Sequence, residues 1–149
     1  MDAITESVDV EVPISVAYNQ WTQFASFPEF MEGVEEVRQL DDTHLHWVIK
    51  LAGITREFDA TITEQHPDQV IAWRSDSGPE HAGRVTFTRI DDVHTRVTAE
   101  MRVDPEGFAE KAADKLGLID RRVKGDMKRF RSFIEARPGA TGAWRDEVN

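Results

Sequence analysis

Apolar and polar residues alternate with a period of two in several segments of the chain, which is the pattern of strands with one buried face. The first segment is SVDVEV at residues 7–12, where three valines alternate with polar neighbours. Six more segments follow, at residues 34–40, 44–51, 54–64, 70–75, 81–90 and 94–103. Short turn sequences separate these six, so we expect successive hairpins and an antiparallel meander.

The alternation assigns one face of this meander to the interior. Apolar residues hold every second position in most of the strands, and the positions between them are mostly polar. The residues expected to face inward are Leu45, Trp47, Ile49, Phe58, Ala60, Ile62, Ile71, Trp73, Val85, Phe87, Val97, Ala99, Met101 and Val103. A long antiparallel sheet twists and curls, so this face is expected to be concave and to need an apolar cover.

Residues 13–30 have helical rather than strand periodicity. The apolar side chains of the first part fall within an arc of roughly 120° on a helical projection. They are Ile14, Ala17, Tyr18, Trp21, Phe24 and Ala25. Pro28 disfavours a helical conformation at Phe27. Ser26 and Glu29 have the spacing of a capping box that would begin a new helix. We therefore expect two short helices with a bend, each turning its aromatic residues inward.

The last apolar stripe predicts one long helix. Asp104 can cap its N-terminus, with Pro105 in the first helical position. The helix is expected to end near Arg137, before Pro138. Its apolar residues share an arc of roughly 120°. They are Phe108, Ala112, Leu116, Ile119, Val123, Met127, Phe130, Phe133 and Ile134. The remaining residues, 138–149, form a polar tail that contains one tryptophan.

Composition fits one globular domain and excludes several functions. The chain has 149 residues, 40% of them hydrophobic and 31% charged, and its lack of cysteine excludes disulfides and thiolate chemistry. Its net charge of −10 opposes a general affinity for nucleic acid or anionic lipid surfaces. The one basic stretch, residues 121–131, is interpreted as the solvated side of a helix. No run of about 18 apolar residues is present, and the polar start does not resemble a secretion signal, so we expect a cytoplasmic protein.

The order of elements is one strand, two short helices, six antiparallel strands and one long helix. This order resembles the START-related helix-grip superfamily, also called SRPBCC. Its polyketide cyclase/dehydrase branch, which includes coenzyme Q-binding START-type relatives, is the most similar in residues 12–37, 54–75 and 85–101. The resemblance implies an α+β helix-grip fold, in which a seven-stranded antiparallel sheet curves around the long C-terminal helix. Residues 1–137 would then form a single START-like domain, followed by the tail.

The resemblance also implies what such a protein can do. Members of the superfamily bind lipids, quinones, polyketides or plant hormones in a central cavity, and some catalyse cyclisation or dehydration. Because the chain has no recognisable catalytic set, the leading hypothesis is binding or carriage of a small hydrophobic ligand between the sheet and the long helix, without a cofactor. Two alternatives stay open: a polyketide cyclase/dehydrase that uses the same cavity, and an interaction module whose cavity has collapsed. In the latter, Trp144 and the tail would dock on a partner or on a second copy in a homodimer.

The residues expected to contact the ligand are the large apolar residues of the inward faces. They are Tyr18, Trp21, Phe24, Phe30, Trp47, Phe58, Trp73, Phe87, Met101, Leu116, Ile119 and Val123. The same side chains could instead fill a solid core. The expected partner is a small hydrophobic molecule and not nucleic acid, and we expect no stable insertion into a membrane.

Three polar residues are candidates for chemistry in the cavity. Arg56 is in phase with the inward positions of its strand, where it can hold a carboxylate or polarise a carbonyl, or else pair with a nearby carboxylate. Asp126 lies at the edge of the long helix's apolar arc, where burial would raise its pKa and suit general acid–base catalysis. An ion pair of this carboxylate with Arg122 or Arg129 is the alternative. Ser75 follows the inward phase of its strand and can offer a hydroxyl.

The histidines do not predict a metal site. His44 and His46 have the spacing of metal ligands on one strand face, but apolar residues hold the inward positions beside them, so both are expected to face water. His66, His81 and His94 lie in or beside turns, where exposure is the simplest expectation.

Overall fold

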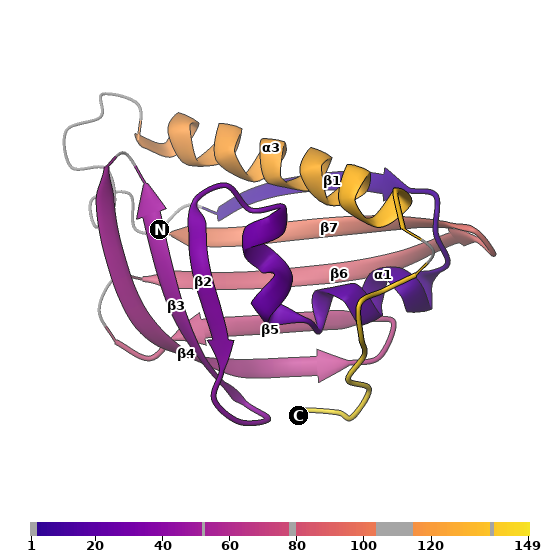
Figure 1. The fold of residues 1–149 in the computed structure, drawn as a ribbon, viewed down its shortest axis with the longest axis horizontal. Helices are drawn as coiled ribbons and strands as arrows, with labels where there is room; N and C mark the ends of the chain where they lie inside the picture. The colour runs from indigo at the N-terminus through magenta and orange to yellow at the C-terminus, as the bar shows by residue number, and fades with distance from the viewer. Residues whose placement is uncertain (1–2, 52, 78–79, 104–114, 138) are drawn as a thin grey trace.

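The computed structural model describes residues 3–51, 53–77, 80–103, 115–137 and 139–149. One antiparallel sheet is built from β1 (Ala3–Val10), β2 (Val34–Gln39), β3 (His44–Leu51), β4 (Ile54–His66), β5 (Val70–Ser75), β6 (His81–Asp91) and β7 (His94–Val103). The strand order is β1-β7-β6-β5-β4-β3-β2 (Figure 1). Strands β2 to β7 form a meander, and β1 pairs with β7 at one edge. The expected seven-stranded antiparallel sheet is confirmed.

The first strand differs from its expected range. β1 begins at Ala3 rather than at residue 7, and it ends at Val10. It pairs with β7 over its whole length, from Ala3 opposite Arg102 to Val10 opposite Thr95. Ile4 is buried and in phase with Val8 and Val10, but the intervening Glu6 interrupts the alternation, so the start of the strand is set by the pairing with β7.

The sheet is curved, and its concave face forms the core. Register shifts interrupt the pairing in β2, β4 and β6. Such irregularities bend a strand and increase its twist. Among the residues expected to face inward, Met101 is half-buried, Val103 has no described side chain, and all the others are buried. The predicted inward face is thus confirmed over the described side chains.

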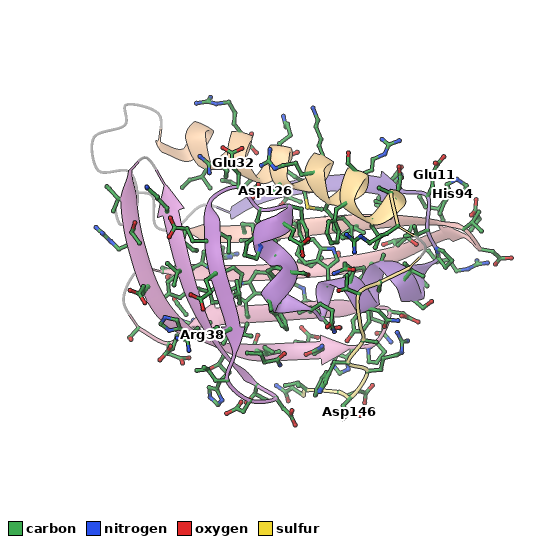
Figure 2. The ribbon with its side chains drawn as sticks, in the orientation of Figure 1. Glu11, Glu32, Arg38, His94, Asp126 and Asp146 are labelled. Carbon is green, nitrogen blue, oxygen red and sulfur yellow. The ribbon has the colours of Figure 1, made fainter. Side chains whose placement is uncertain are left out.

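The strand at the far edge of the sheet, β2, is mostly polar. It pairs only with β3, so one side of its backbone is unpaired within the sheet. Glu35, Glu36 and Arg38 are exposed on it, and the Arg38 guanidinium lies 3.0 Å from a Glu36 carboxylate oxygen. Figure 2 shows Arg38 on this strand.

Two short helices separate β1 from β2, as expected. They are α1 (Ile14–Trp21) and the 3-10 helix η1 (Phe24–Glu29). The capping-box expectation was wrong, because Ser26 lies inside η1 and does not begin it. Its hydroxyl donates to the Gln23 carbonyl oxygen at 2.6 Å and accepts from Gln20 Nε2 at 3.0 Å. The serine therefore ties the two short helices together.

The aromatic residues of these helices fill one half of the interior. Phe27 is fully buried. It lies in ring contact, at centroid distances of 5.1 to 6.2 Å, with Trp21, Phe24, Phe30, Trp47 and Trp73. Pro28 lies within η1, so the bend in the chain brings Phe27 and Phe30 to the inside. In this half of the interior the side chains pack against one another as a solid core, which was the alternative to ligand contact.

The long helix α3 (Lys115–Glu135) covers the concave face, against β1 and β7. Its described inward residues are buried, and they are Ile119, Val123, Met127, Phe130 and Ile134. The expected helix start at Asp104, together with Phe108 and Ala112, lies outside the described residues, and the side chain of Leu116 does too. No helix in the described ranges is long and apolar enough to cross a membrane.

The tail folds back on the domain from which it extends. Residues 139–149 run from the end of α3 past α1 (Figure 1). The Gln20 side chain accepts from the Thr141 backbone N–H at 2.9 Å and donates to the Thr141 hydroxyl at 3.0 Å. Val148 and Gln65 exchange two backbone hydrogen bonds of 2.9 and 3.0 Å. The tail thus fastens α1 to the end of β4 within one chain.

Candidate functional site

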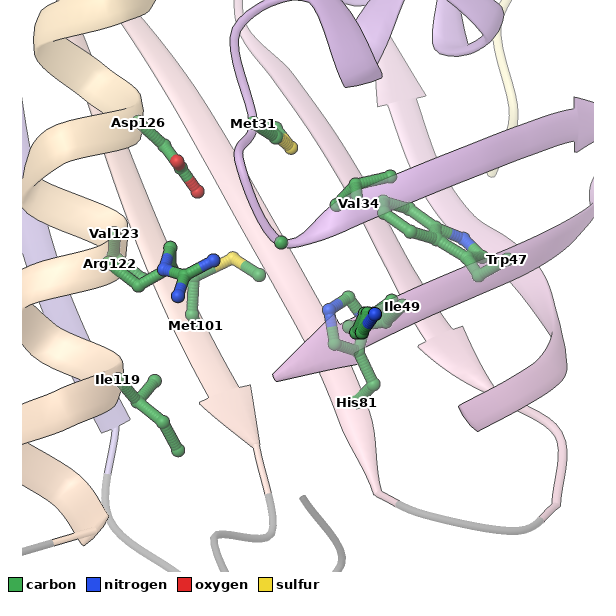
Figure 3. Close-up of a pocket in the computed structure, with 12 residues that line it drawn as sticks. Met31, Val34, Trp47, Ile49, His81, Met101, Ile119, Arg122, Val123 and Asp126 are labelled. Atoms are coloured by element: carbon green, nitrogen blue, oxygen red, sulfur yellow. The ribbon is translucent and has the colours of Figure 1, made fainter. Parts of the chain in front are cut away.

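A pocket of about 80 Å³ lies between the N-terminal half of α3 and the sheet (Figure 3). The loop before β2, the end of β3, the start of β6, β7 and the first turns of α3 contribute to it. Its lining residues are Met31, Gly33, Val34, Trp47, Ile49, Lys50, His81, Met101, Ile119, Arg122, Val123 and Asp126. Most of these side chains are apolar, and the polar ones come from three separate elements.

The volume limits what the pocket can hold in this conformation. Sites for drug-sized ligands usually measure roughly 300–1,000 Å³, whereas an apolar cavity of roughly 150 Å³ can hold benzene. A pocket of about 80 Å³ is about half that size, so as it stands it suits the end of an alkyl chain. A ring such as that of toluene would need the lining to move, and an extended polyketide would need it to move further.

Arg122 brings a positive charge to the rim of the pocket. Its guanidinium packs against Gly33, where an added Cβ would come within 3.0 Å of Nη1. A glycine at this position therefore allows α3 and the loop before β2 to approach closely. Among the described residues, the carboxylate oxygen nearest to Nη1 belongs to Glu32, at 3.8 Å, and the Arg122 side chain is 26% exposed. Within this part of the chain the guanidinium is only loosely paired and can meet a ligand.

Asp126 lies beside it but has structural partners. Its Oδ1 accepts from Arg129 Nη2 and from the Glu32 backbone N–H, the latter at 3.1 Å. Burial raises the pKa of Asp126, and the hydrogen bonds from Arg129 and Glu32 oppose that shift. Figure 2 shows Glu32 and Asp126 close to α3. The expected ion pair with Arg129 is present, and the carboxylate nevertheless lines the pocket.

His81 is buried, so the expectation that it would be exposed is wrong. It is 5% exposed and contacts the pocket from the first residue of β6. Its Nδ1 accepts a hydrogen bond of 3.3 Å from Trp73 Nε1, and its backbone N–H donates to the Ser75 hydroxyl at 3.1 Å. Desolvation lowers the pKa of His81 to about 4, so the ring is neutral at pH 7. The signal was available in the sequence, because His81 has the same phase as the inward residue Val85.

Gly83 makes the contact between Trp73 and His81 geometrically possible. It lies opposite Trp73 across the β5–β6 pairing. An added Cβ would come within 2.3 Å of the Trp73 ring atom Cζ2. The indole therefore occupies the space that any other residue at position 83 would need for its side chain.

The pocket brings together only part of the predicted ligand-contact set. Trp47, Met101, Ile119 and Val123 line it. Other members of the set are buried but do not line the pocket: Tyr18, Trp21, Phe24, Phe30, Phe58, Trp73 and Phe87. The side chain of Leu116 is not described. A role in binding stays a prediction for every member. The set omitted the lining residues Met31, Gly33, Val34, Ile49, Lys50, His81 and Arg122.

Two of the three residues proposed for chemistry lie outside the pocket lining. Arg56 donates from Nη1 to the Thr55 carbonyl oxygen at 3.1 Å. Ser75 holds the backbone of His81 and offers no hydroxyl to the pocket. Asp126 is the one of the three that lines it.

The outward histidines are paired with carboxylates, as their phase indicates. His44 Nδ1 lies 2.8 Å from an Asp41 oxygen, and His46 Nδ1 lies 2.7 Å from an Asp59 oxygen. Hydrogen bonds to Asp59 and Glu57 raise the pKa of His46. Among the described residues, no group of three or more such side chains could hold a metal ion.

We expect His81 to make the stability of the protein fall at acid pH. The folded-state pKa of about 4 lies below the ordinary value of 6.5, so only the unfolded chain takes up this proton between those values. The contribution of the neutral ring is fully present above pH 6.5 and is lost as the pH falls through 4. From pH 7 to pH 4, wild type should lose roughly 3 kcal/mol of unfolding free energy more than His81→Gln.

Urea denaturation of both proteins at the two pH values measures this difference. Because all other carboxylates and histidines are common to the two proteins, their titration cancels. Equal losses would show that the His81 ring takes up a proton in the folded state as easily as in the unfolded chain.

The curved sheet and the helix that covers its concave face define a helix-grip fold. Residues 10–131 match the family model described as polyketide cyclase / dehydrase and lipid transport. Because the match covers most of the chain, the protein belongs to this family.

The chain is similar to individual proteins as well. It is 51% identical over 149 residues to a 17.2 kDa protein from the melC2–rnhH intergenic region of Streptomyces lincolnensis, with 99% of each chain covered. A START superfamily protein from Mycobacterium smegmatis has a TM-score of 0.76 at 10% identity, over 90% of this chain and 97% of that one. The Zhui aromatase/cyclase from Streptomyces sp. R1128 has a TM-score of 0.73 at 15% identity, over 96% and 99%. At such identities the two structures support the fold alone.

Proposed function

We propose that this protein binds a small, mainly apolar ligand in the pocket between α3 and the sheet. The observation that carries the proposal is the pocket itself, an apolar space of about 80 Å³ in an otherwise densely packed aromatic interior. Membership of a family that includes lipid transport supports the proposal.

The lining can adapt to the ligand. Met31 and Met101 both contribute to it, and methionine side chains are unbranched and repack at low cost. Arg122 and Lys50 bring positive charges to the same space. The ligand is therefore expected to place its ring or chain against Ile119 and Val123 and any polar end toward these cations.

Titration with small ring compounds, starting with toluene, tests the proposal. Chemical-shift changes in methyl NMR spectra should localise to Ile119, Val123 and the two methionines, with a dissociation constant of about 0.1–1 mM for a ligand of seven heavy atoms. Val123→Phe fills the pocket and should weaken binding at least about tenfold.

Met127→Phe is the matched control, since Met127 is buried on the same face of α3 but does not line the pocket. It should leave binding within about twofold of wild type. Melting curves show whether both variants are folded. If shifts appear elsewhere, or if Val123→Phe binds as well as wild type, this pocket is not the binding site.

A second candidate function is cyclisation or dehydration of a bound polyketide. The observation that favours it is the half-buried Asp126 carboxyl, whose raised pKa suits proton transfer, next to the Arg122 cation. Conversion of a linear β-polyketone probe, seen by mass spectrometry as loss of one water and removed by Asp126→Asn, would distinguish this function from simple binding. If the probe occupies the pocket without being converted, the cyclase or dehydrase function is contradicted and only the binding function remains.

A further inference from the structure

The two ring nitrogens of His81 have different surroundings. Nδ1 accepts from the Trp73 indole, as described above. An indole N–H can only donate, so the nitrogen that receives it carries no proton. In a neutral imidazole the proton is then on the other nitrogen, Nε2. Among the described residues, Nε2 has no hydrogen-bond partner, and the ring lines the pocket.

The donor that sets this arrangement is held firmly in place. Trp73 is 1% exposed, and its ring stacks on Trp47 with a centroid distance of 5.4 Å and an angle of 25°. The space left by Gly83 accepts its six-membered ring. Rotation of the indole away from His81 would require these neighbours to move, so Nδ1 is expected to remain an acceptor.

We propose that Trp73 is a positioning residue that fixes His81 as a hydrogen-bond donor through Nε2, so that the pocket selects ligands whose buried end carries an oxygen acceptor. The selection of a ligand rests on the proposed function, whereas the tautomer of His81 does not depend on it. Figure 3 shows His81 and Arg122 reaching from opposite sides toward the same space.

The other polar groups of the pocket support selection of an acceptor. Arg122 and Lys50 can only donate. Asp126 is the exception, but its Oδ1 already accepts from Arg129 and from the Glu32 backbone. An apolar ligand would leave the His81 Nε2–H buried without a partner, whereas a carbonyl oxygen would satisfy it. Leaving a buried donor unpaired is unfavourable, so the two classes of ligand should differ in affinity.

NMR of ligand-free protein labelled with ¹⁵N-histidine tests the tautomer directly. Wild type at pH 7 should show a protonated Nε2 and an unprotonated Nδ1 for His81. Trp73→Phe should shift the ring toward the Nδ1–H form or a mixture. Trp47→Phe is the matched control, because its ring also lies against His81, at 5.0 Å, but no hydrogen bond joins them. This control should keep the wild-type tautomer.

Two outcomes would overturn the assignment to Trp73. One is a protonated Nδ1 in wild type, and the other is an identical tautomer in Trp73→Phe. A loss of packing alone would affect both tryptophan variants, so only a change confined to Trp73→Phe supports a positioning role. Melting temperatures of the two variants establish that each is folded.

A matched pair of ligands tests the selection. Cyclohexanone and methylenecyclohexane have nearly the same shape and differ by an oxygen in place of a CH₂ group. Because water solvates the ketone better, the informative quantity is the change in their affinity ratio between proteins. Relative to wild type, the ketone-to-hydrocarbon ratio should fall about tenfold in His81→Leu and about threefold or more in Trp73→Phe.

An unchanged ratio in His81→Leu would overturn the selection. If neither compound binds wild type, the proposed function fails for ligands of this size and the selection fails with it. The ligand-free spectra would still decide whether Trp73 sets the tautomer, so the two failures can be told apart.

Discussion

Phe27→Ala is expected to lower the free energy of unfolding by about 3–5 kcal/mol. The ring is fully buried and contacts five other aromatic rings, from α1, η1, the residue after η1, β3 and β5. Its removal would leave a cavity at the point where these elements meet, and large rings around the cavity cannot easily collapse into it. Urea denaturation at pH 7 measures the change.

Phe133→Ala serves as the control for the loss of a phenyl ring as such. Phe133 is half-buried on α3 and, among the described residues, makes one contact with another aromatic ring, to Phe30 at 5.4 Å. Its removal should cost about 1–2 kcal/mol, because water can reach the space. If the two variants lose similar amounts of unfolding free energy, the Phe27 ring contributes no more to the stability of the core than a half-buried ring does.

Gly83→Val is expected to lower the free energy of unfolding by about 4 kcal/mol or more. Valine normally favours strands, so local propensity predicts a gain. The opposite is expected here because even the first carbon of a side chain would overlap the buried Trp73 ring. The displaced indole would also lose its hydrogen bond to His81, so the pocket should change with the stability.

Ala82→Val on the same strand is the matched control. Ala82 points to the other side of β6 and is half-buried, so a larger side chain there should change stability by less than about 1 kcal/mol. Combining Gly83→Val with Trp73→Leu should recover part of the loss, because the overlap is removed. If the two valine variants are equally stable, the close approach of Trp73 to the backbone at Gly83 does not occur.

The fold was largely predictable because its signals are local. Turn or helix-start sequences on both sides fix β3, β5 and β7 to the residue, although only β3 and β7 also alternate between apolar and polar positions, since the first four residues of β5 are all apolar. The parts that were missed depend on partners distant in sequence. β1 takes its start from β7, and the Ser26 hydroxyl bonds to Gln20 and Gln23 rather than capping a helix.

The site was less predictable, because periodicity identifies inward residues without saying which of them leave space. Trp21 and Trp47 have the same inward character in the sequence, yet only Trp47 contacts the pocket. The rings near α1 meet one another and close the interior there. At the other end, Gly33 and the methionines leave room. The exposure of His81 was predicted wrongly because the residue lies beside a turn. Its position in β6 has the same phase as the buried Val85, which indicated an inward side chain.

The charged border of the sheet at β2 has a consequence for self-association. Two copies that joined their sheets through β2 would bring together two strands that each expose two glutamates, Glu35 and Glu36, and one arginine, Arg38. Because each strand exposes more acidic than basic residues, this pairing of edge strands would be repulsive at neutral pH. Charged edge strands of this kind prevent aggregation through unpaired sheet edges. Any homodimer of this chain should therefore use another surface.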